Sequence, residues 1–263
     1  MKRLFLDGTA IEVSGSGPPV VLLHGVGLDQ TVWTYQVEAL AASHQVITYD
    51  LLGHGRSAPA PADARLANWV GQLESVVSHL ALQTFLLVGF SFGGFISQRY
   101  AALHPGKING LVLVSTVYDR SEAERISVVS RLGTARREGP GAIVSAALSR
   151  WFSREFAEGH PAVMKHYEAM LRGNDAASFL SAYACFATGD KELVNALVDF
   201  PRPTLVMTGE LDAGSTPGMA RKLAGVIPFA ECSIIARGRH MMPVEMPDEV
   251  NSALREFLEG GSP

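Results

Sequence analysis

The sequence predicts an α/β fold with a mostly parallel sheet of eight strands, helices on both of its faces, and a helical cap inserted after the sixth strand. Short apolar runs, many of them β-branched, alternate with longer segments of helical period along the chain. Between the runs Gly110–Val114 and Thr204–Thr208 no further run of this kind occurs, and the pattern is helical from about Ser121 to Leu197. These two observations lead to the predicted fold.

The expected strands of the sheet are continuous apolar runs, which is typical of strands covered on both faces. Their ranges are Val20–Leu23, Val46–Tyr49, Phe85–Val88, Gly110–Val114, Thr204–Thr208 and Cys232–Ile235. Ahead of them, Lys2–Asp7 and Ala10–Ser14 are expected to form an antiparallel hairpin that turns at Asp7-Gly8.

The long helical stretch divides the expected core domain into two parts, residues 1–118 and 201–263, with a cap over residues 119–200. Pro201 and Pro203 mark the return of the chain to the sheet. A cap inserted at this point covers the carboxyl edge of the sheet, where open α/β folds bind their ligands.

The composition is that of a globular protein, with 47% hydrophobic and 18% charged residues in 263. The net charge of -4 is spread evenly, so we expect no nucleic-acid partner. No apolar run is long enough for a secretory signal or a membrane span, and we expect a cytoplasmic location. Cys185 and Cys232 form no metal-binding spacing and are expected to be reduced thiols. For the oligomeric state, the sequence is compatible with both a monomer and a dimer.

Ser91 is the expected nucleophile. The run Phe85–Val88 leads into Gly89-Phe90-Ser91-Phe92-Gly93, and a helical pattern follows. A serine on a sharp turn between a strand and a helix needs small residues two positions to either side, because larger ones would collide with nearby backbone. This is the G-x-S-x-G pattern in the context that its chemistry requires.

A serine hydroxyl needs a base and an acid that orients the base. His240 follows the last expected strand, and Asp212 follows the strand before it, so the order serine, acid, histidine is kept. Glu210 and Asp119 are alternative candidates for the acid.

The backbone N–H groups of Val26 and Phe92 are the expected oxyanion-hole donors. Val26 lies in a glycine-bracketed turn after a strand, and Phe92 follows the nucleophile at the start of a helix. The polar segment Asp50–Ser57 also follows a strand, and we interpret it as a rigid turn whose side chains satisfy buried backbone groups.

The motifs described above together resemble the α/β-hydrolase superfamily, and the resemblance extends from about Val20 to Leu258. They are His24-Gly25, Asp50–Ser57, Gly89–Gly94, Gly209–Asp212 and His240. Further residues are similar to the branch that contains 3-oxoadipate enol-lactonase and related carboxylesterases: Arg150-Trp151-Phe152, Tyr183-Ala184-Cys185 and Pro217–Ile227.

The resemblance implies a serine hydrolase that cleaves a small carboxylic ester or enol-lactone through an acyl-enzyme, without metal or organic cofactor, in aromatic compound catabolism. It also implies that Trp151 lines the pocket and that a cap arginine, Arg150 or Arg154, faces an acid group of the substrate. Met241 is expected to make the pocket more apolar. Two alternatives stay open: a carbon–carbon bond hydrolase of the meta-cleavage product type, and a slow-turnover ligand receptor on the same fold.

Overall fold

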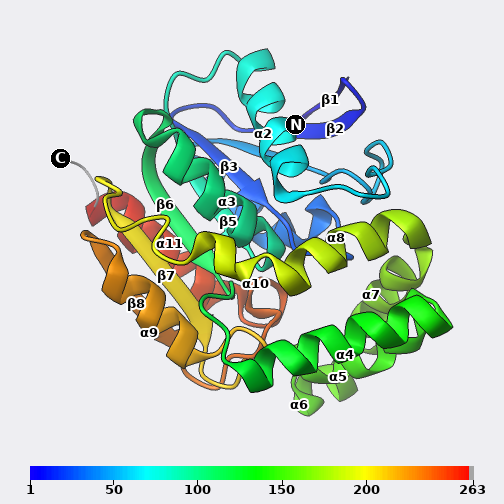
Figure 1. Cartoon of the computed structure of the whole chain (residues 1–263). Helices are drawn as coiled ribbons and strands as arrows, with labels where there is room; N and C mark the ends of the chain where they lie inside the picture. The colour runs from blue at the N-terminus through cyan, green and yellow to red at the C-terminus, as the bar shows by residue number, and fades with distance from the viewer. Residues whose placement is uncertain (261–263) are drawn as a thin grey trace.

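The computed structural model describes residues 1–260, which contain one sheet of eight strands (Figure 1). The strands lie in the spatial order β1-β2-β4-β3-β5-β6-β7-β8. β2 alone runs opposite to the other seven strands, so the sheet is mostly parallel, as predicted. Their bounds are β1 (Lys2–Leu6), β2 (Thr9–Ser14), β3 (Pro19–Leu23), β4 (Gln45–Tyr49), β5 (Phe85–Phe90), β6 (Ile108–Val114), β7 (Thr204–Gly209) and β8 (Ala230–Ile235).

Two strands begin two residues earlier than their apolar runs suggest. β6 starts at Ile108 rather than Gly110, and β8 starts at Ala230 rather than Cys232. In each case the added part contains a polar, exposed residue, Asn109 or Glu231. Strand residues at a sheet edge or strand end can face water, so hydrophobicity alone misses them.

Side chains alternate between the two faces of the sheet and fill two hydrophobic cores. In β6, Leu111 and Leu113 belong to one core, and Val112 and Val114 to the other. Figure 1 shows helices on both sides of the sheet. The first core is covered by α2 (Leu66–His79), α3 (Phe92–Leu103) and α9 (Pro217–Val226), and the second by α1 (Thr34–Leu40), α10 (Met242–Glu245) and α11 (Pro247–Gly260).

Five α-helices lie between β6 and β7, and we call them the helical insert. They are α4 (Glu122–Glu138), α5 (Val144–Trp151), α6 (Arg154–Gly159), α7 (Pro161–Gly173) and α8 (Ala176–Thr188). In Figure 1 the insert lies at the end of the sheet toward which the arrows of the parallel strands point. The fold therefore has its helical insertion after the sixth strand, as the sequence predicts.

A buried ion cluster joins the two ends of the helical insert. Asp190, just after α8, accepts hydrogen bonds from Arg120 Nη1 at 3.3 Å and from Arg125 Nη1 at 2.7 Å. It also accepts the backbone N–H of Arg120 at 3.2 Å. Because the Arg120 and Asp190 side chains are almost completely buried, this cluster fixes the start of the insert to its end.

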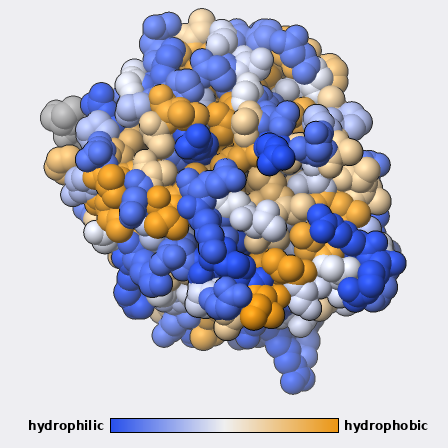
Figure 2. Space-filling view, viewed as in Figure 1, coloured by the Kyte–Doolittle hydropathy of each residue, from blue (hydrophilic) through white to orange (hydrophobic). Residues whose placement is uncertain are grey.

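The surface carries no single apolar band on the face that Figure 2 shows, where hydrophobic residues form separate groups between hydrophilic ones. Within residues 1–260 no helix combines the length and the hydrophobicity that a membrane crossing requires.

Candidate active site

Ser91 occupies a strained turn between β5 and α3, with φ 54° and ψ -111°. A Cβ atom on Gly89 would lie 2.5 Å from the carbonyl oxygen of Gly93, and one on Gly93 would overlap the carbonyl oxygen of Leu23. Both positions therefore require glycine, which explains the spacing G-x-S-x-G in physical terms.

Backbone hydrogen bonds hold the turn in place. The N–H of Ser91 donates to the carbonyl oxygen of Val114 at 2.9 Å. The Thr116 hydroxyl donates to the carbonyl oxygen of Ser91 at 3.0 Å. Because both backbone groups of Ser91 are engaged, its side chain is left as the free polar group of the turn.

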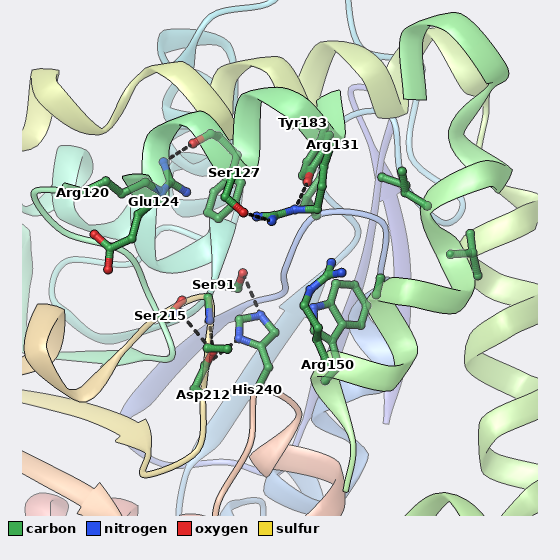
Figure 3. A pocket seen from close by; sticks show the side chains of 18 of the residues that line it. Ser91, Arg120, Glu124, Ser127, Arg131, Arg150, Tyr183, Asp212, Ser215 and His240 are labelled. Atoms are coloured by element: carbon green, nitrogen blue, oxygen red, sulfur yellow. Dashed lines mark hydrogen bonds and ion pairs between the residues drawn. The ribbon is translucent and has the colours of Figure 1, made fainter. Parts of the chain in front are cut away.

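The structure brings Ser91, His240 and Asp212 together from three separate loops (Figure 3). The Nε2 atom of His240 lies 3.2 Å from Ser91 Oγ, and its Nδ1 atom lies 2.7 Å from Asp212 Oδ2. Asp212 follows β7 and His240 follows β8, so the parallel strands deliver both side chains to the same edge as Ser91. All three side chains are buried, which strengthens the interactions between them.

The Asp212 carboxylate is held by more than the histidine. Its Oδ1 atom accepts the backbone N–H groups of Gly214 at 2.8 Å and Ser215 at 2.9 Å. With Oδ1 occupied by two donors, Oδ2 is directed at His240. This arrangement fixes the Nδ1–H tautomer of His240 and leaves Nε2 as a proton acceptor facing Ser91.

The two alternative acids lie elsewhere. Glu210 is exposed and accepts the backbone N–H of Arg237 at 2.9 Å. Asp119 pairs with Lys222 at 3.3 Å near the surface. Of the three candidates, only Asp212 contacts His240.

Val26 and Phe92, the two expected oxyanion-hole residues, both lie close to Ser91. Val26 lines the cavity next to Ser91, and Gly27 after it has a φ of 79°. Phe92 is the first residue of α3, where an N–H has no partner within its helix. The Phe92 ring packs into the core against Trp69, at a centroid distance of 5.0 Å, and against Phe186. The bulk of this side chain therefore points away from the site.

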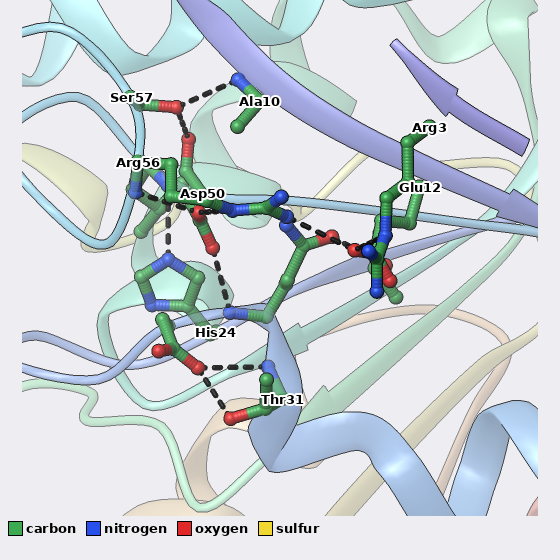
Figure 4. A network of polar contacts seen from close by, with 12 residues as sticks. Arg3, Ala10, Glu12, His24, Thr31, Asp50, Arg56 and Ser57 are labelled. Atoms are coloured by element: carbon green, nitrogen blue, oxygen red, sulfur yellow. Dashed lines mark hydrogen bonds and ion pairs between the residues drawn. The ribbon is translucent and has the colours of Figure 1, made fainter. Parts of the chain in front are cut away.

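The segment Asp50–Ser57 is a rigid turn, as predicted (Figure 4). Asp50 accepts the backbone N–H groups of Gln30 and Arg56, each at 2.9 Å. His24 Nε2 accepts the N–H of Leu51 at 2.9 Å. Burial lowers the pKa of His24 to about 4 and that of His54 to about 3, so both imidazoles are neutral. The polar side chains of this segment brace the backbone beneath the site.

A cavity of about 320 Å³ opens onto Ser91 and His240 and has a mostly apolar lining from the helical insert. The Trp151 ring lies over His240, with centroids 5.6 Å apart. Arg150 also lines the cavity, and burial, followed by the charge of Arg131, lowers its pKa. Trp151 and Arg150 thus both lie in the wall of the cavity that contains Ser91.

Similarity to known proteins identifies the family of this chain. A sequence profile described as the alpha/beta hydrolase family matches residues 20–253. The chain belongs to this family. The resemblance seen in the sequence is thereby confirmed, and the protein is a hydrolase.

Several known proteins are similar to this α/β hydrolase over nearly the whole length of the chain. It is 30% identical over 245 residues to (E)-2-((N-methylformamido)methylene)succinate hydrolase of Acinetobacter baylyi, covering 93% of this chain and 92% of the relative. A thermophilic esterase from Thermogutta terrifontis, solved with malate bound, has a TM-score of 0.88 at 29% identity, covering 99% of both chains. The enol-lactonase from Burkholderia xenovorans LB400 has a TM-score of 0.88 at 26% identity, covering 98% of this chain and 100% of that one.

Two predicted pocket residues of the hydrolase lie outside the cavity. The Arg154 side chain is 90% exposed and pairs with Glu158, because it opens α6 on the solvent side of the insert. Met241 is fully buried in the second hydrophobic core, and its N–H donates to the carbonyl oxygen of Trp151. Of the two candidate arginines, Arg154 therefore does not reach the cavity, and Met241 does not line it as expected.

Arg131 and Tyr183 line the cavity of the hydrolase. Arg131 is not among the residues predicted from the sequence, and Tyr183 is named there only within a segment that is similar to the enol-lactonase branch. The Arg131 Nε–H donates to the Tyr183 hydroxyl at 3.2 Å, and Nη1 donates to Ser127 Oγ at 2.7 Å. The only sequence signal is that Ser127 and Arg131 are four residues apart and so share a face of α4. No group of three or more His, Cys, Asp or Glu side chains in residues 1–260 is arranged to hold a metal ion.

Proposed function

We propose that this hydrolase cleaves a small carboxylic ester or lactone through an acyl-enzyme formed on Ser91. The observation that carries the proposal is the position of His240, whose two ring nitrogens lie 3.2 Å from Ser91 Oγ and 2.7 Å from Asp212 Oδ2 at the mouth of a cavity. This is the geometry of a nucleophile, a general base and an orienting acid.

In the first half of the reaction, His240 Nε2 takes the proton of Ser91 while Oγ attacks the carbonyl carbon. The imidazolium that forms is stabilised by Asp212, which stays ionised. His240 then gives the proton to the leaving alcohol oxygen as the bond from that oxygen to carbon breaks. A lactone keeps this alcohol in the same molecule, so both ends stay in the cavity until the second step.

In the second half, a water molecule loses its proton to His240 and attacks the acyl carbon. The bond to Ser91 Oγ breaks, and Oγ recovers the proton. In both halves the negative charge on the carbonyl oxygen needs donors, and we assign these to the backbone N–H groups of Val26 and Phe92. One donor of this kind is worth about 3 kcal/mol of transition-state stabilisation.

The size of the cavity and the relatives support a small substrate. A volume of about 320 Å³ is near the lower end of ligand sites. Two similar proteins are an enol-lactonase and an esterase, and the esterase was solved with malate, a small acid. We assign Trp151 to the substrate-binding wall, because its ring lies against His240.

The test uses Ser91→Ala with Ser145→Ala as a control, because Ser145 is an exposed serine of α5. The expected result is loss of p-nitrophenyl acetate turnover by at least about a thousandfold in Ser91→Ala only, with an unchanged circular dichroism spectrum. An alkyl phosphonate should add its mass to the wild type and not to Ser91→Ala. Undiminished ester and lactone turnover in Ser91→Ala, or cleavage of dienoates alone by the wild type, would overturn the proposal.

A further inference from the structure

Two arginines of the helical insert reach the same cavity as Ser91 (Figure 3). Arg131 comes from α4 and Arg150 from the end of α5. Within residues 1–260 neither guanidinium is in a salt bridge with a carboxylate. Two uncompensated positive charges therefore face a largely apolar cavity.

Arg120 lines the same cavity and provides the contrast. Its guanidinium is neutralised by Asp190 and lies over the Phe186 ring at 4.5 Å. Arg120, which helps to hold the insert together, is thus paired with a carboxylate of the protein itself. In the part of the chain that the structure describes, Arg131 and Arg150 have no such partner, so packing alone does not account for their charges.

Arg131 is nevertheless held in a defined position. Its Nε–H and Nη1–H groups donate to the hydroxyls of Tyr183 and Ser127, which are neutral. These bonds orient the guanidinium without compensating its charge, and among residues 1–260 they leave Nη2 without a hydrogen-bond partner. Because the Tyr183 hydroxyl accepts from Arg131, its own proton can be donated to a ligand.

Arg150 is half-buried in the same wall, and Arg131 is close enough to lower its pKa further, after burial. The acidic side chains that line the cavity are already engaged. Glu124 accepts the N–H and hydroxyl of Ser121, and Asp212 accepts His240. Two like charges in a partly desolvated wall oppose each other unless an anion lies between them.

We propose that Arg131 and Arg150 together bind a carboxylate of the substrate, with Tyr183 as a third donor, so that the hydrolase selects small esters or lactones that carry an acid group. The inference rests on the proposed function, because it concerns the substrate of the same cavity. A guanidinium presents paired N–H donors that match the two oxygens of a carboxylate. Arg131 is a specificity residue in this scheme, and Ser127 positions it.

The experiment compares charged and neutral esters of nearly equal shape. Monomethyl succinate and methyl isocaproate differ by a carboxylate on the acyl side, and 3-acetoxypropanoate and isopentyl acetate differ by one on the alcohol side. The measured quantity is the ratio of kcat/KM for the charged ester to that for its neutral partner, obtained by titrating the released acid. The variants are Arg131→Gln, Arg150→Gln, their combination, and the exposed control Arg154→Gln.

For one of the two pairs, each single variant should lower this ratio by about ten- to a hundredfold. The double variant should lower it by less than the product of the two, because both arginines hold the same carboxylate. Arg154→Gln should keep the wild-type ratio. Equal losses for charged and neutral esters, or an unchanged ratio in both single variants, would overturn the inference.

A binding measurement separates the inference from the proposed function. In Ser91→Ala, succinate should bind by calorimetry, and adding Arg131→Gln or Arg150→Gln should weaken that binding by about tenfold or more. If Ser91→Ala still turns over esters, the proposed function fails by itself. If esters need Ser91 while succinate binds equally well with and without the two arginines, only the inference fails.

Discussion

Replacement of Asp212 by asparagine tests how the acid controls the histidine. The carboxylate accepts two backbone N–H groups at Oδ1 and the His240 N–H at Oδ2. In Asp212→Asn the amide oxygen must take the Oδ1 position, since an NH2 group there would face two donors. The NH2 group then points at His240 Nδ1, which must become an acceptor. The imidazole proton moves to Nε2 and faces Ser91, so the base is lost.

The expected effect on kcat is large and the effect on stability is small. Forcing the wrong tautomer and removing the charge opposite the imidazolium lowers kcat by about ten-thousandfold, or about 5.5 kcal/mol. Because the hydrogen bonds from Gly214 and Ser215 survive, the melting temperature should change by only about 2 °C. Asp212→Ala leaves both N–H groups without an acceptor and should destabilise the fold by about 1–3 kcal/mol.

The assay is hydrolysis of p-nitrophenyl acetate at saturating substrate, with thermal unfolding of each variant. Glu210→Gln and Asp119→Asn are the matched controls, since both replace an acid that was a candidate and that does not contact His240. They should keep kcat within about threefold of the wild type. The reasoning is refuted if Asp212→Asn keeps a tenth of the wild-type kcat, or if one of the controls shows the large loss instead.

Two further predictions concern stability. Asp190→Ala leaves Arg120 and Arg125 without their carboxylate and should lower the free energy of unfolding in urea by about 3–5 kcal/mol. Glu158→Ala, on the surface, should lower it by less than about 1 kcal/mol. Similar losses for the two variants would contradict the buried character of the cluster around Asp190. The pKa values of His24, about 4, and His54, about 3, lie below that of an unfolded histidine. Their contribution to the free energy of unfolding is therefore complete above about pH 6.5 and is lost as the pH falls. The loss is about 1.4 kcal/mol per pH unit for each histidine. Burial raises the pKa of Asp50, and this shift has the opposite effect on stability as the pH falls. Urea unfolding should still show a net loss of the free energy of unfolding between pH 7 and 4.5. A constant free energy of unfolding over that range would argue against neutral histidines.

Much of the fold follows from local patterns in the sequence. Buried parallel strands such as Phe85–Phe90 are apolar throughout, and the turn at Ser91 needs glycines at defined offsets. The sheet then brings Asp212 and His240 to the edge where Ser91 lies, because they follow β7 and β8, which run parallel to β5. These features depend on short-range chemistry and on a topology that has few alternatives.

The walls of the cavity could be predicted only in part. Arg150 and Arg154 are four residues apart but belong to two helices, since Ser153 begins a new one. One side chain therefore faces the cavity and the other faces water. Arg131 meets Tyr183 only because α4 and α8 pack against each other. The angle and depth of that packing depend on the whole insert, and no local pattern of residues determines them.

The ion cluster of Arg120, Arg125 and Asp190 has a consequence for how this scaffold can change. The cluster holds both ends of the helical insert at one point. The insert therefore carries the ion pairs that attach it to the rest of the fold, and it can be exchanged as a unit. A different set of helices bearing the same three charges could be grafted there while the strands and their loops stay intact. Selectivity could then diversify, in evolution or in the laboratory, without rebuilding the chemistry beneath it.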